Sequence, residues 1–91
     1  MSEPDSELSA TAWAVLGVLS FPGEDRSGYE VKSWADRSLQ YFYWSPALSQ
    51  IYRELKLLES IGYVTSYTAP QDELRNKRLY RLTDAGRQAV S

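Results

Sequence analysis

The sequence predicts a single α+β domain that is mostly helical. Apolar residues recur at helical spacing in three successive stretches within the first 62 residues. Two stretches rich in β-branched and aromatic residues follow, and polar turn formers separate them. A last short stretch opens like a helix. With 91 residues, the chain has the length of one domain with a small core.

The first seven residues predict a flexible tail, and the domain is expected to span residues 8–91. Residues 1–7 are acidic and lack apolar anchors. Residues 8–20 predict the first helix, with Ser9 as N-cap because a serine oxygen can accept from the free N–H groups of the first turn. The helix has too many apolar residues for one narrow stripe, which indicates that most of its surface is buried. Gly17 predicts close packing against another helix.

The second helix is expected over residues 28–39. The preceding segment FPGEDR, residues 21–26, has the composition of a turn, and Ser27 can cap the helix. The apolar side of this helix is expected to consist of Tyr29, Val31, Trp34 and Ala35.

The run QYFYW at residues 40–44 places four aromatic rings in five positions. We favour a hydrophobic connection that packs under the domain. A homodimer surface and a stacking platform for single-stranded nucleic acid are the alternatives. Stacking platforms usually have basic neighbours, and this run contains no Lys or Arg.

The third helix, over residues 45–61, organises the chain. Ser45 is expected to cap it, and Pro46 suits the first helical position, where its missing N–H would have no partner anyway. Gly62 can close the helix with a left-handed backbone. Leu57 lies outside the apolar stripe and has no explanation in the sequence. The stripe itself consists of Leu48, Ile51, Leu55 and Leu58.

The opposite face of this helix carries side chains that can read nucleotides. Ser49, Arg53 and Lys56 lie opposite the stripe, and Gln50 lies beside them. Arg pairs well with guanine, Gln with adenine, and Ser or Lys with bases or phosphates. For this helix taken alone, a solvated face without a partner is the alternative.

Residues 63–69 and 77–82 predict the two strands of a hairpin, because both are rich in β-branched, aromatic or apolar residues. A polar turn joins them, and Thr83 is expected to cap a final short helix. The hairpin tip is basic and carries Arg75, Lys77 and Arg78.

The order helix, helix, helix, strand, strand, helix is that of a winged helix-turn-helix: three helices, a two-stranded antiparallel wing and the start of a fourth helix. An α-helix about 10–12 Å across fits a major groove about 12 Å wide. This arrangement predicts that residues 45–61 enter the major groove of double-stranded DNA. Residues 70–78 would then reach the backbone or the minor groove.

Composition excludes several other functions. The chain has no Cys and no His, so it lacks disulfides, the usual zinc ligands and the common acid–base and nucleophile pairs of enzymes. We therefore expect no metal, no cofactor and no enzymatic activity. No apolar run approaches the ~20 residues of a membrane span, and the acidic start is unlike a signal peptide. We expect a cytoplasmic protein.

Charge is distributed unevenly along the chain. The formal net charge is −2, yet residues 45–81 hold six bases against four acids, a net charge of +2. This mild asymmetry places the positive charge where DNA contacts are expected.

The sequence resembles the DNA-binding domain of the PadR family of bacterial transcriptional regulators over residues 8–90. The resemblance rests on LSATAWAVLGVLSFPGEDRSGYEVK, SPALSQIYRELKLLESIGYV and RLYRLTDAGRQAV. It implies a ligand- or stress-responsive repressor that binds a near-palindromic operator as a homodimer, with a possible small-molecule inducer.

The resemblance also implies three groups of DNA contacts. The residues for the major groove are Ser45, Ser49, Gln50 and Arg53, those for the backbone are Tyr52 and Lys56, and those of the wing are Arg75, Lys77 and Arg78.

Family members usually continue from the fourth helix into a helical region that makes most of the dimer, whereas this sequence reaches only Ser91. Either it is an excised DNA-binding domain or it is a short variant that dimerises otherwise. A winged-helix protein-interaction module without DNA binding is the alternative function, and it predicts self-association through Trp13 or the Tyr41–Trp44 run.

Overall fold

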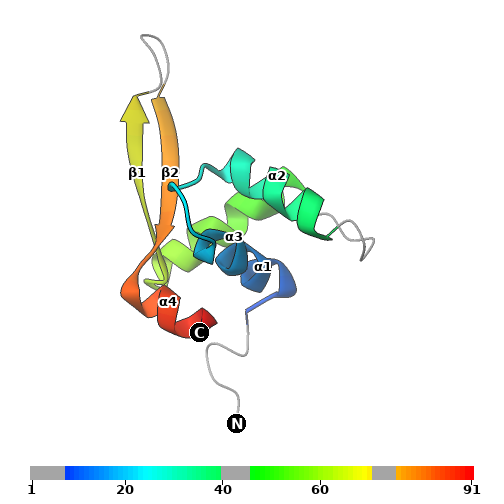
Figure 1. Ribbon diagram of the computed structural model, residues 1–91, viewed down its shortest axis with the longest axis vertical. Helices are drawn as coiled ribbons and strands as arrows, with labels where there is room; N and C mark the ends of the chain where they lie inside the picture. Colours follow the sequence, from blue (N-terminus) through cyan, green and yellow to red (C-terminus); the bar gives the residue numbers. More distant parts are fainter. Residues whose placement is uncertain (1–7, 40–45, 71–75) are drawn as a thin grey trace.

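The computed structural model describes residues 8–39, 46–70 and 76–91. Within these ranges it has four helices and one two-stranded antiparallel sheet, which confirms the predicted fold class (Figure 1). The elements in chain order are α1 (Ala10–Ser20), α2 (Gly28–Leu39), α3 (Leu48–Ser60), β1 (Val64–Pro70), β2 (Asn76–Leu82) and α4 (Asp84–Val90).

Helix α1 lies at the centre of the fold and packs against the other three helices and β2. Leu16 on α1, Val31 on α2 and the α3 residues Ile51, Leu55 and Leu58 are 0% exposed. Burying one such side chain stabilises the fold by about 1.5–3 kcal/mol relative to exposing it. Three of the four residues of the predicted stripe therefore hold α3 in the core, while Leu48 is only half-buried, and the opposite face of the helix points outward.

The predicted helix caps are present at three helix starts. Ser9 Oγ accepts from the N–H of Ala12 at 3.0 Å, and Thr83 Oγ1 accepts from the N–H of Gly86 at 3.1 Å. At the start of α2, Ser27 Oγ accepts from the Glu30 N–H while a Glu30 carboxylate oxygen accepts from the Ser27 N–H. This reciprocal pair satisfies two N–H groups that have no partner within the helix.

The hairpin projects away from the helices as a wing (Figure 1). Its register runs from Val64 opposite Leu82 to Pro70 opposite Asn76. Near its base, the α1–α2 loop joins the sheet, because Arg26 and Tyr80 exchange two backbone hydrogen bonds with N–O distances of 3.2 and 2.8 Å. The wing is therefore attached to the loop before α2 as well as to its own neighbours in sequence.

The third helix begins later than predicted. Helix α3 starts at Leu48, and its N-cap is Ala47, whose side chain makes no capping hydrogen bond. The Ala47 carbonyl already accepts from two N–H groups of the first turn, so the prediction that Ser45 caps this helix is wrong. Pro46 precedes the helix, and its ring is fully buried. Gly62 adopts φ of 88°, the left-handed backbone predicted for the helix end.

Two further predictions about helix faces are wrong. Tyr29 was expected on the apolar side of α2, but it is 67% exposed, because it lies two residues and hence about 200° from the buried Val31. Gly17 was expected at a close helix contact, but a Cβ built there would meet no heavy atom of a neighbouring element within 4 Å.

Some predictions fall outside the described residues. These are the flexible tail at residues 1–7, the aromatic run at residues 40–44 and the polar turn at residues 71–75. Among the helices that the structure does describe, none is both long enough and apolar enough to span a membrane.

Candidate nucleic-acid interface

The outer face of α3 is polar and open. Ser49, Arg53 and Lys56 are exposed, and they lie on the side of the helix away from the buried stripe. Ser45, the first predicted member of this group, lies outside the described residues.

Tyr52 lies on the flank of α3 and packs its ring against the start of α2. It is 43% exposed, and a Cβ built at Gly28 would lie 2.7 Å from Cζ of the Tyr52 ring. Only glycine therefore lets this ring rest where it does. No local pattern predicts this contact, because it joins residues 24 positions apart in the sequence.

Gln50 is partly committed to the protein itself. Its amide Nε2 donates to Thr11 Oγ1 at 3.2 Å, and the residue is half-buried. One turn along, Glu54 is buried and accepts a hydrogen bond from Ser9 Oγ at 3.1 Å. These two polar contacts fix the rotation of α3 against α1.

The basic residues of the wing make contacts with acidic or polar neighbours. Lys77 Nζ lies 3.1 Å from a Glu30 carboxylate oxygen. Arg78 donates to Ser66 Oγ at 2.9 Å, and Ser66 donates to the Glu59 carboxylate at 2.8 Å. Arg75 lies outside the described residues.

The Glu30 carboxylate is held in its charged form. Partial burial acts to raise its pKa, but the Ser27 backbone N–H and the Lys77 ammonium outweigh burial and bring the pKa below its ordinary value. The side chain that caps α2 thus also fixes one strand of the wing.

Asp25 attaches both strands of the wing to the α1–α2 loop. Its carboxylate lies 3.3 Å from Nε of Arg81 on β2 and accepts a hydrogen bond from the Tyr67 hydroxyl on β1. The Arg81 guanidinium also lies 5.5 Å from the centre of the Tyr67 ring. The hydrogen bond to the carboxylate raises the pKa of Tyr67.

Arg26 is a buried cation that sequence patterns did not reveal. Its guanidinium donates to the carbonyl oxygens of Val18, Phe21 and Pro22 at 3.3–3.4 Å, and the residue is 9% exposed. The sequence pattern places Arg26 in a polar turn, where a charged side chain is expected to be exposed. Three carbonyl acceptors around one side chain stabilise the loop from within.

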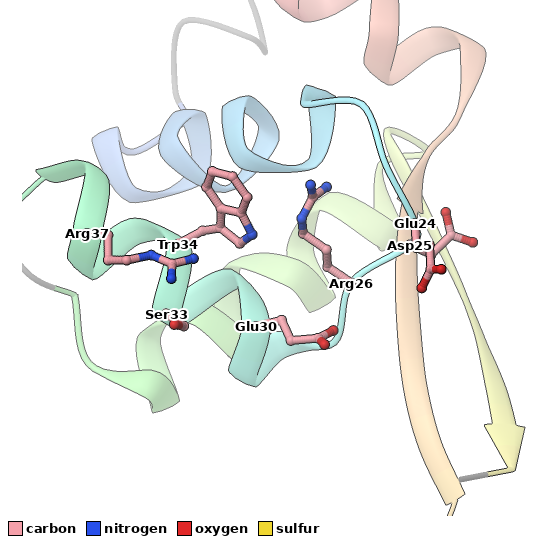
Figure 2. A pocket seen from close by; sticks show the side chains of 7 residues that line it. All are labelled: Glu24, Asp25, Arg26, Glu30, Ser33, Trp34 and Arg37. Atoms are coloured by element: carbon pink, nitrogen blue, oxygen red, sulfur yellow. The ribbon is translucent and has the colours of Figure 1, made fainter.

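A hollow of about 420 Å³ lies between this loop and α2 (Figure 2). In Figure 2 the carboxylates of Glu24 and Asp25 lie beside the base of the wing, and Arg37 lies at the other end. The Trp34 ring between them contacts two guanidinium groups, with ring-centre distances of 5.1 Å to Arg26 and 5.2 Å to Arg37. The volume lies in the ordinary range for small-molecule sites, roughly 300–1,000 Å³. The residues lining it are Glu24, Asp25, Arg26, Glu30, Ser33, Trp34 and Arg37.

A metal site has no support in the described ranges, since no three Asp or Glu residues there lie close enough together to hold an ion.

Three packed helices followed by an antiparallel hairpin, with exposed basic side chains on the third helix and on the hairpin, define the winged helix-turn-helix class. The chain belongs to the transcriptional regulator PadR-like family, whose sequence model matches residues 15–91. This match confirms the family resemblance inferred from the sequence.

Relatives with known roles are transcriptional regulators. The negative transcriptional regulator PadR of Bacillus subtilis (strain 168) is 43% identical over 78 residues, covering 86% of this chain and 41% of that protein. A crystal structure of Bacillus subtilis PadR in complex with operator DNA has a TM-score of 0.78 at 38% identity, covering 89% of this chain and 44% of that one. A crystal structure of the same protein in complex with p-coumaric acid has a TM-score of 0.69 at 36% identity, covering 90% of this chain and 42% of that one. The chain thus spans less than half the length of these relatives.

Proposed function

We propose that residues 8–91 form one domain that binds double-stranded DNA in a sequence-specific manner and represses transcription in the cytoplasm. The outer face of α3 carries this proposal: Ser49, Arg53 and Lys56 are exposed on a helix whose opposite face is buried. The relative that was solved with operator DNA supports it. The function is binding, and it calls for no catalysis.

In this proposal α3 enters the major groove. Ser45, Ser49, Gln50 and Arg53 meet base edges, and Tyr52 and Lys56 meet phosphates. One N–H of the Gln50 amide continues to donate a hydrogen bond to Thr11 Oγ1. The carbonyl oxygen and the second N–H of that amide match the donor and acceptor that adenine offers.

The wing supplies contacts to the backbone or the minor groove through Arg75, Lys77 and Arg78. Phosphate contacts add affinity without sequence information, whereas base contacts add specificity. Lys77 would exchange the Glu30 carboxylate for a phosphate, and both partners are anionic oxygens.

A homodimer on a near-palindromic operator completes the proposal, since joining two half-site contacts raises affinity through effective concentration. A small-molecule inducer belongs to it as well, supported by the relative solved with p-coumaric acid.

Fluorescence anisotropy of the chain on a labelled mixed-sequence duplex, at several salt concentrations, tests the proposal. We expect binding that weakens steeply with salt, with a log–log slope of about −0.9 for each neutralised phosphate. The matched variants are Arg53→Ala on α3 and Arg87→Ala on α4, both exposed arginines. The first should weaken binding and the second should not. If two copies joined by a flexible linker also fail to bind at low salt, the proposal is wrong.

Protein binding without DNA is the second candidate. Leu57 and Ile61 favour it, because they lie four residues apart at the end of α3 and are 42% and 46% exposed. It predicts self-association that Leu57→Ser with Ile61→Ser abolishes, measured by sedimentation velocity, and no salt-sensitive binding to the duplex.

A further inference from the structure

We propose that Tyr29 on α2 is a further DNA contact, whose hydroxyl donates to a backbone phosphate beside α3. This inference rests on the proposed function. It adds a residue from the second helix to contacts that otherwise come from α3 and the wing.

No contact in the described part of the chain explains why Tyr29 is exposed. At 67% exposed, Tyr29 is the most exposed large apolar residue that the structure describes. Its hydroxyl has no hydrogen-bond partner in the described part of the chain. The other apolar residues predicted for this helix face inward, with Val31 at 0% and Ala35 at 1% exposed. A phenol on the outside of a helix is available to a partner.

Two observations place Tyr29 along one edge of α3. Its neighbour Gly28 lies under the Tyr52 ring. Tyr29 itself shares a groove of about 350 Å³ with Leu48 at the start of α3. Leu48 and Tyr52 are four residues apart and therefore lie on the same side of that helix. Tyr29 thus borders the edge from which Tyr52 projects.

This edge is where a DNA strand would pass. When the second helix of a helix-turn-helix lies in the major groove, the helix before it crosses the backbone. Tyrosine hydroxyls are common donors to phosphate oxygens. In the same groove, Lys32 and Asp36 pair with each other at 2.7 Å, so they add little net charge against a phosphate.

Substitutions at Tyr29 test the inference. The affinity of each variant chain for a labelled mixed-sequence duplex is measured by fluorescence anisotropy at several salt concentrations. Tyr29→Phe should weaken binding about tenfold, because one hydrogen bond to a charged oxygen is lost. Tyr29→Glu should weaken it about thirtyfold or more at low salt, and Tyr29→Arg should bind with a salt slope steeper by about 0.9. Gln88→Glu on α4, also exposed, adds the same charge away from α3 and should change binding less than about threefold.

The outcomes separate the inference from the function on which it rests. If the unaltered chain binds and Tyr29→Glu matches Gln88→Glu, the contact at Tyr29 is wrong while DNA binding stands. If neither the unaltered chain nor its linked pair binds, both are wrong. Graded effects in the order Arg, Tyr, Phe, Glu support the contact.

Discussion

Lys77 on β2 and Glu30 on α2 form an ion pair in which Nζ and Oε2 are 3.1 Å apart. The same carboxylate accepts the Ser27 N–H through its other oxygen, at 2.8 Å. One side chain therefore couples the start of α2 to the wing. In the proposed complex, the phosphate must compete with this carboxylate for the lysine.

Glu30→Gln should strengthen DNA binding. The glutamine carbonyl can keep the cap on Ser27, while the charge that holds Lys77 is gone. We expect affinity for a mixed-sequence duplex to rise about threefold at low salt, and the gain should shrink as salt screens it. Fluorescence anisotropy at several salt concentrations measures the affinity and its dependence on salt. Glu24→Gln in the preceding loop makes the same charge change without a lysine partner, and an equal gain there would contradict the competition.

Glu30 should also make stability depend on pH. Because its pKa is lower in the folded chain than in the unfolded chain, the unfolded state takes up more protons as the pH falls. The stability from Glu30 is therefore present at neutral pH and lost as the pH falls through the lowered pKa. The Glu30 side chain is 43% exposed, so water screens this contribution and keeps it small.

Urea denaturation of the native chain and Glu30→Gln measures this effect. The difference in unfolding free energy should shrink from pH 7 to about pH 3, below the ordinary glutamate pKa of about 4.3. A difference that stays constant over this range would show that the carboxylate charge does not stabilise the fold.

Gly28→Ala should act on DNA binding through Tyr52. The new methyl group would collide with the Tyr52 ring, which can swing outward because its flank is open. We expect stability to change by less than about 1 kcal/mol, because the first helical turn tolerates either residue. DNA affinity should fall as far as it does for Tyr52→Ala. The double variant should be no worse than either single variant, and additive losses would disprove the coupling.

Gly17 and Gly86 should respond to alanine in opposite directions. A Cβ at Gly17 meets no neighbouring element, so Gly17→Ala should stabilise the fold by about 0.5–1 kcal/mol through the unfolded state and helix propensity. A Cβ at Gly86 would strike the backbone carbonyl oxygen of Tyr63, so Gly86→Ala should destabilise by about 1–3 kcal/mol. Urea denaturation measures the change in unfolding free energy for each variant, and a stabilising Gly86→Ala would disprove the close approach to Tyr63.

The sequence predicted the elements because their signals are local. Ser9, Ser27 and Thr83 cap the helices expected of them, and Ile51, Leu55 and Leu58 point inward as their spacing requires. Tyr29 was placed wrongly because it was counted with the apolar residues, although an amphipathic phenol can also lie on the surface.

The remaining features depend on residues far apart in the chain. Gly28 touches Tyr52, Lys77 pairs with Glu30, and Asp25 joins both strands, and no local pattern marks such partners. The burial of Arg26 contradicts the usual exposure of a charged side chain, and the carbonyl oxygens around its guanidinium make this burial possible. For the predicted contacts, the sequence indicated which side of α3 faces outward, but not that Thr11 holds Gln50.

The two backbone hydrogen bonds between Arg26 and Tyr80 have a consequence for cooperativity. They join the base of the wing to a loop that closes only when α1 and α2 are packed. The Tyr80 amide should therefore exchange its hydrogen with solvent only through openings that also release the helices, and not by fraying of the hairpin. The base of the wing then belongs to the same folding unit as the helical core, so that a substitution weakening the core would loosen the wing as well.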